Sequence, residues 1–139
     1  MPSVPSPFRP RKRNEPPSPS RTFSVPVERA IEHCRVFVDG EALPGEFTPH
    51  SALQAVEEYG RGFVWVGLHE PMESQMTKVA SEFRIHELIV EDVVQAHQRP
   101  KLERYDDVEF VVLRPAWYVD EEEDVQVGEI HLFLGGDFV

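Results

Sequence analysis

The stretch that decides the fold is FRIHELIVEDVVQAHQRPKLERY, residues 83–105. Leucine, isoleucine and valine recur in its first half at helical spacing, which predicts a helix from His86 to about His97. Pro100 ends this helix, because the residue before a proline is disfavoured in the helical region of backbone space. The rest of the chain is read outward from this helix.

Strand and helix patterns follow one another on both sides of it. Apolar residues before Asp39-Gly40 predict a strand and a turn, and Thr48 before Pro49 predicts a capped helix start. The other predicted elements are a strand at 63–68 that is apolar on both faces and so buried, a helix from Pro71 to Phe83, and strands at 108–113 and 125–134, with the acidic run 120–124 as the loop between them. This order predicts an α/β (α+β) domain with a mixed β-sheet flanked by helices.

Composition divides the chain into a tail and a folded part. Residues 1–30 hold eight of the 13 prolines, several serines and a net charge of +4. Such a segment buries too little apolar surface to offset backbone ordering, so we expect a disordered basic tail. Residues 31–139 are predicted to form one domain with a net charge of −15, which attracts cations and repels phosphate backbones. We therefore expect no nucleic acid as a partner.

Apolar runs and cysteine usage favour a soluble, cytoplasmic chain. The longest apolar runs, such as 63–66, are four residues long, whereas a spanning helix needs about 20. The basic N-terminus lacks the apolar core of a secretory signal. Cys34 is the single cysteine, so no intramolecular disulfide can form.

Catalytic patterns are missing from the sequence. It contains no GxxxxGK[ST] phosphate loop, no GxGxxG after a strand, no HExxH and no paired CxxC. On one continuous helix, His86 and His97 would lie about 16 Å apart at 1.5 Å per residue, so they could not share a metal ion. We therefore do not expect an enzyme.

Two adjacent carboxylates, Glu91 and Asp92, interrupt the apolar residues of the predicted helix. One interpretation is a polar edge on a buried helix, with a carboxylate bonded to a nearby arginine such as Arg99. The other is a site for a hard cation, because Mg²⁺ prefers oxygen ligands and often takes only one or two carboxylates from protein. The residues alone leave both interpretations open.

Residues 83–105 resemble the signature of the cytoplasmic domains of CorA-type magnesium and cobalt transporters, F-G-[IL]-H-x-L-x-[LIV]-E-D-[IV]-x-x-x-x-Q-R-P-K-[LV]-E-x-[YF]. The matching signature residues are His86, Glu91, Asp92, Gln98, Arg99, Pro100 and Lys101. The similarity extends over about residues 36–139. Arg84 stands where the family usually has a glycine, which puts the local turn in question.

The resemblance implies an α/β/α domain on the cytoplasmic side of the plasma (inner) membrane. In the full-length family five copies form a funnel below a membrane pore, and Mg²⁺ or Co²⁺ binds between neighbouring protomers as the regulatory ligand. Asp92 occupies the position of a metal ligand, and Glu91 beside it is implied to act through water. When cytosolic Mg²⁺ falls, the sites empty and the funnel opens.

The last residues predict an incomplete domain. Residues 130–139 read as a strand, a turn and the start of another strand, and a hairpin that stops there would leave an edge unpaired and apolar residues exposed. We therefore expect a fragment of marginal stability that lacks the pore and would reach the membrane only through helices missing from this chain. The alternative is a free-standing soluble interaction domain that binds transporter subunits.

Overall fold

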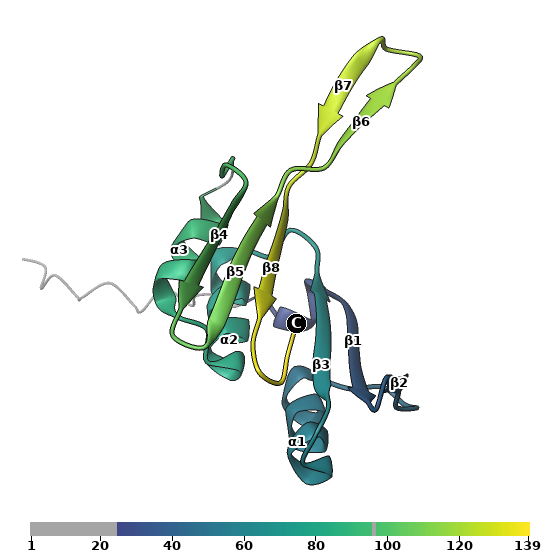
Figure 1. Ribbon diagram of the computed structural model, residues 1–139, viewed down its shortest axis with the longest axis vertical. Coiled ribbons are helices and arrows are strands. Elements are labelled where there is room, and N and C mark those ends of the chain that lie inside the picture. Colours follow the sequence, from purple (N-terminus) through teal and green to yellow (C-terminus); the bar gives the residue numbers. More distant parts are fainter. Residues whose placement is uncertain (1–24, 96) are drawn as a thin grey trace, which may run out of the picture.

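The computed structural model describes residues 25–95 and 97–139, so residues 1–24 of the predicted tail lie outside the described part (Figure 1). The elements in chain order are a 3-10 turn η1 (Val27–Arg29), β1 (Ile31–Val38), β2 (Glu41–Ala42), α1 (Pro49–Tyr59), β3 (Phe63–Leu68), α2 (Glu73–Phe83), α3 (Glu87–Val94), β4 (Lys101–Tyr105), β5 (Val108–Leu113), β6 (Ala116–Val119), β7 (Asp124–Val127) and β8 (Ile130–Leu134). The predicted α+β class is confirmed.

The first sheet has the strand order β2-β1-β3, with antiparallel pairs. Asp39 and Gly40 both have positive φ, 52° and 84°, which suits the tight turn that joins β1 to β2. Helix α1 packs against β1 and β3. Its start is capped as predicted, since the Thr48 side chain accepts a hydrogen bond from the backbone N–H of Ser51.

The second sheet has the order β4-β5-β8, again antiparallel, with α2 and α3 behind it in Figure 1. Alternate residues of β5 point into the core: Val108, Phe110 and Val112 are buried. One hydrophobic core joins both sheets and all three α-helices. It includes Val36 and Val64 from the first sheet and Ile89 from α3.

The strand predicted over 125–134 is wrong, because this segment belongs to two different sheets. Strand β7 ends at Val127 and pairs with β6, whereas β8 starts at Ile130 and pairs with β5. Residues 120–123 of the acidic run thus form the tip of the β6–β7 hairpin, and the run does not connect β5 to a long last strand. The hairpin projects beyond the rest of the domain in Figure 1, and its Trp117 and Tyr118 are exposed.

The unpaired edge predicted for the last residues is also wrong. Phe138 is buried and forms a parallel bridge to Val64 of β3. The Val139 N–H donates to the Val64 carbonyl at 2.8 Å, and the Val66 N–H donates to the Val139 carbonyl at 2.9 Å. The chain therefore leaves β8, turns and continues beside β3 rather than back along β8, which makes the first sheet mixed at this edge.

Two local predictions need correction. Helix α3 ends at Val94 rather than near His97, because Gln95 has left the helical region with φ −79° and ψ 91°, and His97 has a φ of 73°. Strand β3 is not buried on both faces, since Trp65 is 45% exposed while Val64 is fully buried.

Arg84 keeps the turn that a glycine makes in the resembled pattern. It has φ 55° and ψ 38° at the C-terminus of α2, and the Ile85 N–H bonds the Ala80 carbonyl at 2.8 Å. This left-handed conformation is strained for any residue with a Cβ, but not for glycine.

We expect Arg84→Gly to raise the free energy of unfolding by about 0.5–1 kcal/mol in urea titrations. Ser81→Gly, at an exposed position within α2, should lower it instead; a gain from both would contradict this reasoning.

Candidate functional site

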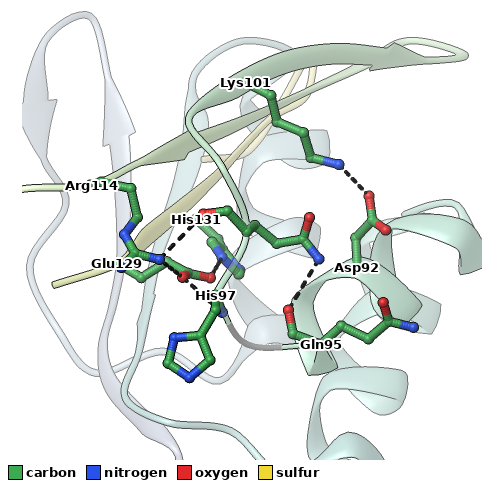
Figure 2. Close-up of polar contacts among 8 residues, drawn as sticks. Asp92, Gln95, His97, Lys101, Arg114, Glu129 and His131 are labelled. Carbon is green, nitrogen blue, oxygen red and sulfur yellow. Dashed lines mark hydrogen bonds and ion pairs between the residues drawn. The ribbon is translucent and has the colours of Figure 1, made fainter.

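Asp92 lies in the last turn of α3 and is held by a lysine from β4. Its Oδ2 atom is 2.6 Å from Nζ of Lys101, and the two side chains are 27% and 24% exposed (Figure 2). The arginine partner suggested by the sequence is wrong, because Arg99 is exposed and the bonded cation is Lys101. The C-terminal end of a helix carries partial negative charge, which adds to the attraction of this position for cations.

Lys101 also contacts a second carboxylate on its own strand. Its Nζ lies 3.0 Å from Oε2 of Glu103, and the hydroxyl of Tyr105 donates to the same oxygen at 2.9 Å. Residues two apart on a strand share a face, which places these three side chains together. The ammonium also lies 5.5 Å from the centre of the Phe110 ring. Asp92, Lys101, Glu103 and Tyr105 are called the Asp92 cluster below.

Hydrogen bonds favour the protonated forms of Lys101 and Tyr105. The bond to Asp92 is the largest influence on Lys101 and raises the pKa of the ammonium, against an opposing effect of burial. The bond to Glu103 likewise raises the pKa of the Tyr105 hydroxyl. At neutral pH, Lys101 is therefore a cation and Tyr105 a hydrogen-bond donor.

Of the other signature residues, His86 and Gln98 make hydrogen bonds with the backbone and three are exposed. His86 caps α3, where its Nδ1 accepts from the Leu88 N–H at 3.2 Å, and its ring stacks on Tyr105 at 5.7 Å. Gln98 donates to the Gln95 carbonyl at 3.1 Å. Glu91, Arg99 and Pro100 are exposed. The structure thus brings Asp92 and Lys101 together but leaves the Glu91 side chain on the solvent side of α3.

A second cluster centres on Glu129, which the sequence analysis did not single out. Its Oε2 accepts hydrogen bonds from Arg114 Nη1 at 2.8 Å and from the His97 N–H at 3.1 Å, and its Oε1 contacts His131 Nε2 (Figure 2). Arg114 also donates to the Gln98 carbonyl at 3.3 Å. Glu129 therefore joins the loop after α3, the residue after β5, and β8. The sequence did offer one signal for this cluster. Glu129 and His131 are two residues apart in a segment with a strand pattern, and this spacing places both side chains on the same face.

The carboxyl of Glu129 is biased toward its charged form. Partial burial favours the protonated acid, but the hydrogen bond and charge of His131 and the charge of Arg114 outweigh it. The pKa of Glu129 therefore lies below its ordinary value of 4.5.

The donor chemistry near Asp92 fits Mg²⁺ better than a softer metal. The Asp92 cluster offers carboxylate and hydroxyl oxygens, the ligands that Mg²⁺ prefers while keeping several waters. Across residues 25–95 and 97–139, no group of three or more histidine, cysteine, aspartate or glutamate side chains is arranged to hold a metal ion. Burial raises the pKa of the Cys34 thiol above its ordinary value of 9.0, so the sulfur is not a thiolate at neutral pH. A cation at Asp92 would therefore be held by few protein ligands.

Comparison with known proteins gives the class first. The chain is 30% identical over 87 residues to a Bacillus subtilis protein named as a metal ion transporter, YfjQ, and the aligned part is 63% of this chain and 26% of that protein. It is 33% identical over 57 residues to the cobalt/magnesium transport protein CorA of Thermotoga maritima, covering 41% of this chain and 16% of the relative. The chain thus spans about a quarter or less of these relatives. Both relatives are named as metal-ion transport proteins.

The family follows from a match that covers more than half of the chain. The family described as CorA-like Mg²⁺ transporter protein matches residues 60–139, which include both clusters and β3 to β8. The chain belongs to the CorA-like Mg²⁺ transporter family. In the part of the chain that the structure describes, every helix is too short or too polar to cross a membrane.

Proposed function

We propose that this chain is a magnesium-sensing regulatory domain of a CorA-like divalent-cation transporter. The observation that carries the proposal is the position of Asp92: a partly exposed carboxylate at a helix C-terminus, already bound to a cation, Lys101 Nζ, at 2.6 Å. Mg²⁺ would be held by Asp92 and supplies a compact double positive charge there. Glu91, exposed one residue earlier, would act on a water of the hydrated ion.

The proposal extends to assembly and location. The acidic domain of residues 31–139 would contact the same domain of a second copy of the chain. A divalent ion between two negatively charged surfaces would stabilise that contact. An ion that binds only the closed arrangement shifts the population toward it by its differential affinity. A pentamer on the cytoplasmic side of a membrane is the assembly in which we place the domain, with Mg²⁺ and Co²⁺ as the cations of the whole transporter.

Replacing Asp92 with asparagine tests the site. For the unchanged chain, Mg²⁺ at about ten times its dissociation constant should stabilise the fold by about 1.4 kcal/mol, a rise in Tm of about 5–10 °C. Asp92→Asn should remove most of this rise, because the amide has no charge to attract the ion. The measurement is a thermal melt with and without MgCl₂ at constant ionic strength.

The control removes the same charge elsewhere. Asp39 is 65% exposed and paired with Arg61, far along the chain from α3. Asp39→Asn should keep the Mg²⁺-dependent rise in Tm. An equal loss in both variants would show that Mg²⁺ acts through the net charge of the domain, and the assignment of Asp92 would fail.

A second candidate function, binding to transporter subunits, is favoured by the β6–β7 hairpin. Four of its large apolar side chains, Trp117, Tyr118, Val125 and Val127, are at least 50% exposed. A two-stranded hairpin is marginally stable alone, so a partner surface would stabilise it. Co-elution of the chain with a full-length relative in size-exclusion chromatography, abolished by Trp117→Ser, would support this function.

A further inference from the structure

Lys101 is bound to two carboxylates at once, and the two bonds are unequal. Its Nζ is 2.6 Å from Asp92 Oδ2 and 3.0 Å from Glu103 Oε2. Asp92 comes from α3 and Glu103 from β4, the strand of Lys101 itself. A shift of Nζ away from α3 would therefore keep the contact with Glu103 while breaking that with Asp92.

The surroundings of Lys101 permit such a shift. The side chain is 24% exposed and Glu103 40% exposed, so water reaches both groups. Lysine carries its charge on a flexible four-carbon stem with rotatable donors, unlike the rigid fork of arginine. The Tyr105 hydroxyl holds Glu103 Oε2 from another side at 2.9 Å, which keeps the carboxylate in place when Lys101 moves.

We propose that Lys101 is a tethered competitor of the divalent cation at Asp92, occupying that carboxylate in the metal-free protein and retreating to Glu103 when the ion binds. The inference rests on the proposed function only in that Asp92 is taken to bind the ion. Lys101 lowers the affinity of Asp92 for Mg²⁺, since its bond must be broken first. Glu103 reduces this penalty because it retains the displaced ammonium. Glu103 is a positioning residue here and acts through Lys101.

The competition sets the Mg²⁺ concentration at which the site fills. A carboxylate without a resident cation would bind Mg²⁺ at lower concentration, and one with an arginine in place of Lys101 would bind it less readily. The Asp92–Lys101 ion pair would thus set the affinity of the site for Mg²⁺.

The test is an Mg²⁺ titration of the 139-residue chain, followed by the amide signals of residues 91–95 in NMR spectra at constant ionic strength. Lys101→Met, which keeps an unbranched apolar stem but removes the ammonium, should lower the apparent dissociation constant at least about fivefold, the lower end of typical coupling between sites. Arg61→Met makes the same change of charge at an ion pair whose side chains are 61% and 65% exposed, and should change the constant far less. Equal tightening in both variants would overturn the proposal.

A double-mutant cycle separates Glu103 from a direct ligand. Glu103→Gln alone should weaken Mg²⁺ binding more than the remote Asp39→Asn does, because Lys101 then has only Asp92 as a charged partner. In the Lys101→Met background, Glu103→Gln should weaken binding no more than Asp39→Asn. A larger loss in that background would show that Glu103 itself holds the ion and would overturn its role through Lys101.

The unchanged chain provides a readout if Lys101→Met does not fold. Saturation with MgCl₂ should move the side-chain signals of Lys101 while its bond to Glu103 persists; signals that stay fixed while Mg²⁺ binds at Asp92 would refute displacement. Failure of the proposed function has a different signature: the Asp92→Asn variant would then bind Mg²⁺ as tightly as the unchanged chain does. Loss of binding in Asp92→Asn without tightening in Lys101→Met would retain the sensor and reject the competitor.

Discussion

Replacing Phe110 with alanine is expected to destabilise the domain by about 3–5 kcal/mol, the usual cost of deleting a buried aromatic ring. Phe110 is fully buried in β5 and stacks on Phe133 with ring centres 5.3 Å apart. Its ring lies nearly perpendicular to that of His131, with ring centres 5.6 Å apart. Its loss would leave a cavity in the middle strand of the second sheet. Denaturation in urea, monitored by circular dichroism, measures the change.

The matched control for Phe110 is Leu102 on the neighbouring strand β4. Leu102 is 66% exposed, so Leu102→Ala should change the free energy of unfolding by no more than about 0.5 kcal/mol. A cost below about 1 kcal/mol for Phe110→Ala would mean that the two sheets do not share the core described above. Because the ring also lies beside Lys101, this variant should disturb the Asp92 cluster as well.

Glu129→Gln is expected to cost about 2 kcal/mol at neutral pH, because hydrogen bonds to charged groups contribute about 1.5–3 kcal/mol. The side chains of Glu129, Arg114 and His131 are between 13% and 26% exposed, so water compensates only partly for a lost partner. The side-chain oxygen of the new glutamine can still accept one hydrogen bond from Arg114. Its NH₂ group, however, takes the place of a charged carboxylate oxygen and cannot accept a hydrogen bond. Urea denaturation at pH 7 measures this cost.

The same residue predicts how stability depends on pH. A carboxyl with a folded-state pKa below its unfolded value contributes stability above the unfolded pKa. That stability is lost as the pH falls through the folded pKa. For Glu129 the loss should begin near its ordinary value of 4.5 and continue below it. Glu129→Gln should remove this part of the acid dependence, since glutamine does not titrate.

The control for Glu129 is Glu58→Gln, on the exposed side of α1. This change removes the same charge at a residue that belongs to neither cluster. This variant should remain within about 0.5 kcal/mol of the unchanged chain at pH 7. If Glu129→Gln behaves like Glu58→Gln at every pH, the Glu129 cluster does not stabilise the loop after α3.

Local patterns determined most of the elements. The helical spacing of Met76, Val79, Ala80 and Phe83 gave α2, and their burial confirms it, since an amphipathic helix buries its apolar face wherever the rest of the chain lies. Thr48, Pro49 and Gly60 gave the limits of α1, because caps and stops act within a few residues. The E-D and Q-R-P-K residues gave the family, which the match over residues 60–139 confirms.

Strand pairing could not be determined in this way. The alternating residues of 125–134 fit one strand or two, and only the partners, β6 for one part and β5 for the other, divide the segment at Gly128. The last residues likewise form a hairpin or a new parallel neighbour of β3 with equal local plausibility. Non-local hydrogen bonds decide between them, and these depend on which edge is free after the rest has folded.

The sequence by itself determined the α+β class, the helices and the family. Only the tertiary structure showed that Asp92 pairs with the ammonium group of Lys101. It alone also showed that Glu129 joins three segments of the chain. The physical reason is distance along the chain: Asp92 and Lys101 are nine residues apart, and Glu129 and His97 are 32 apart. A residue pattern reports neighbours within about one helical turn or two strand positions, whereas an ion pair forms between whatever groups the packed elements bring within hydrogen-bond distance.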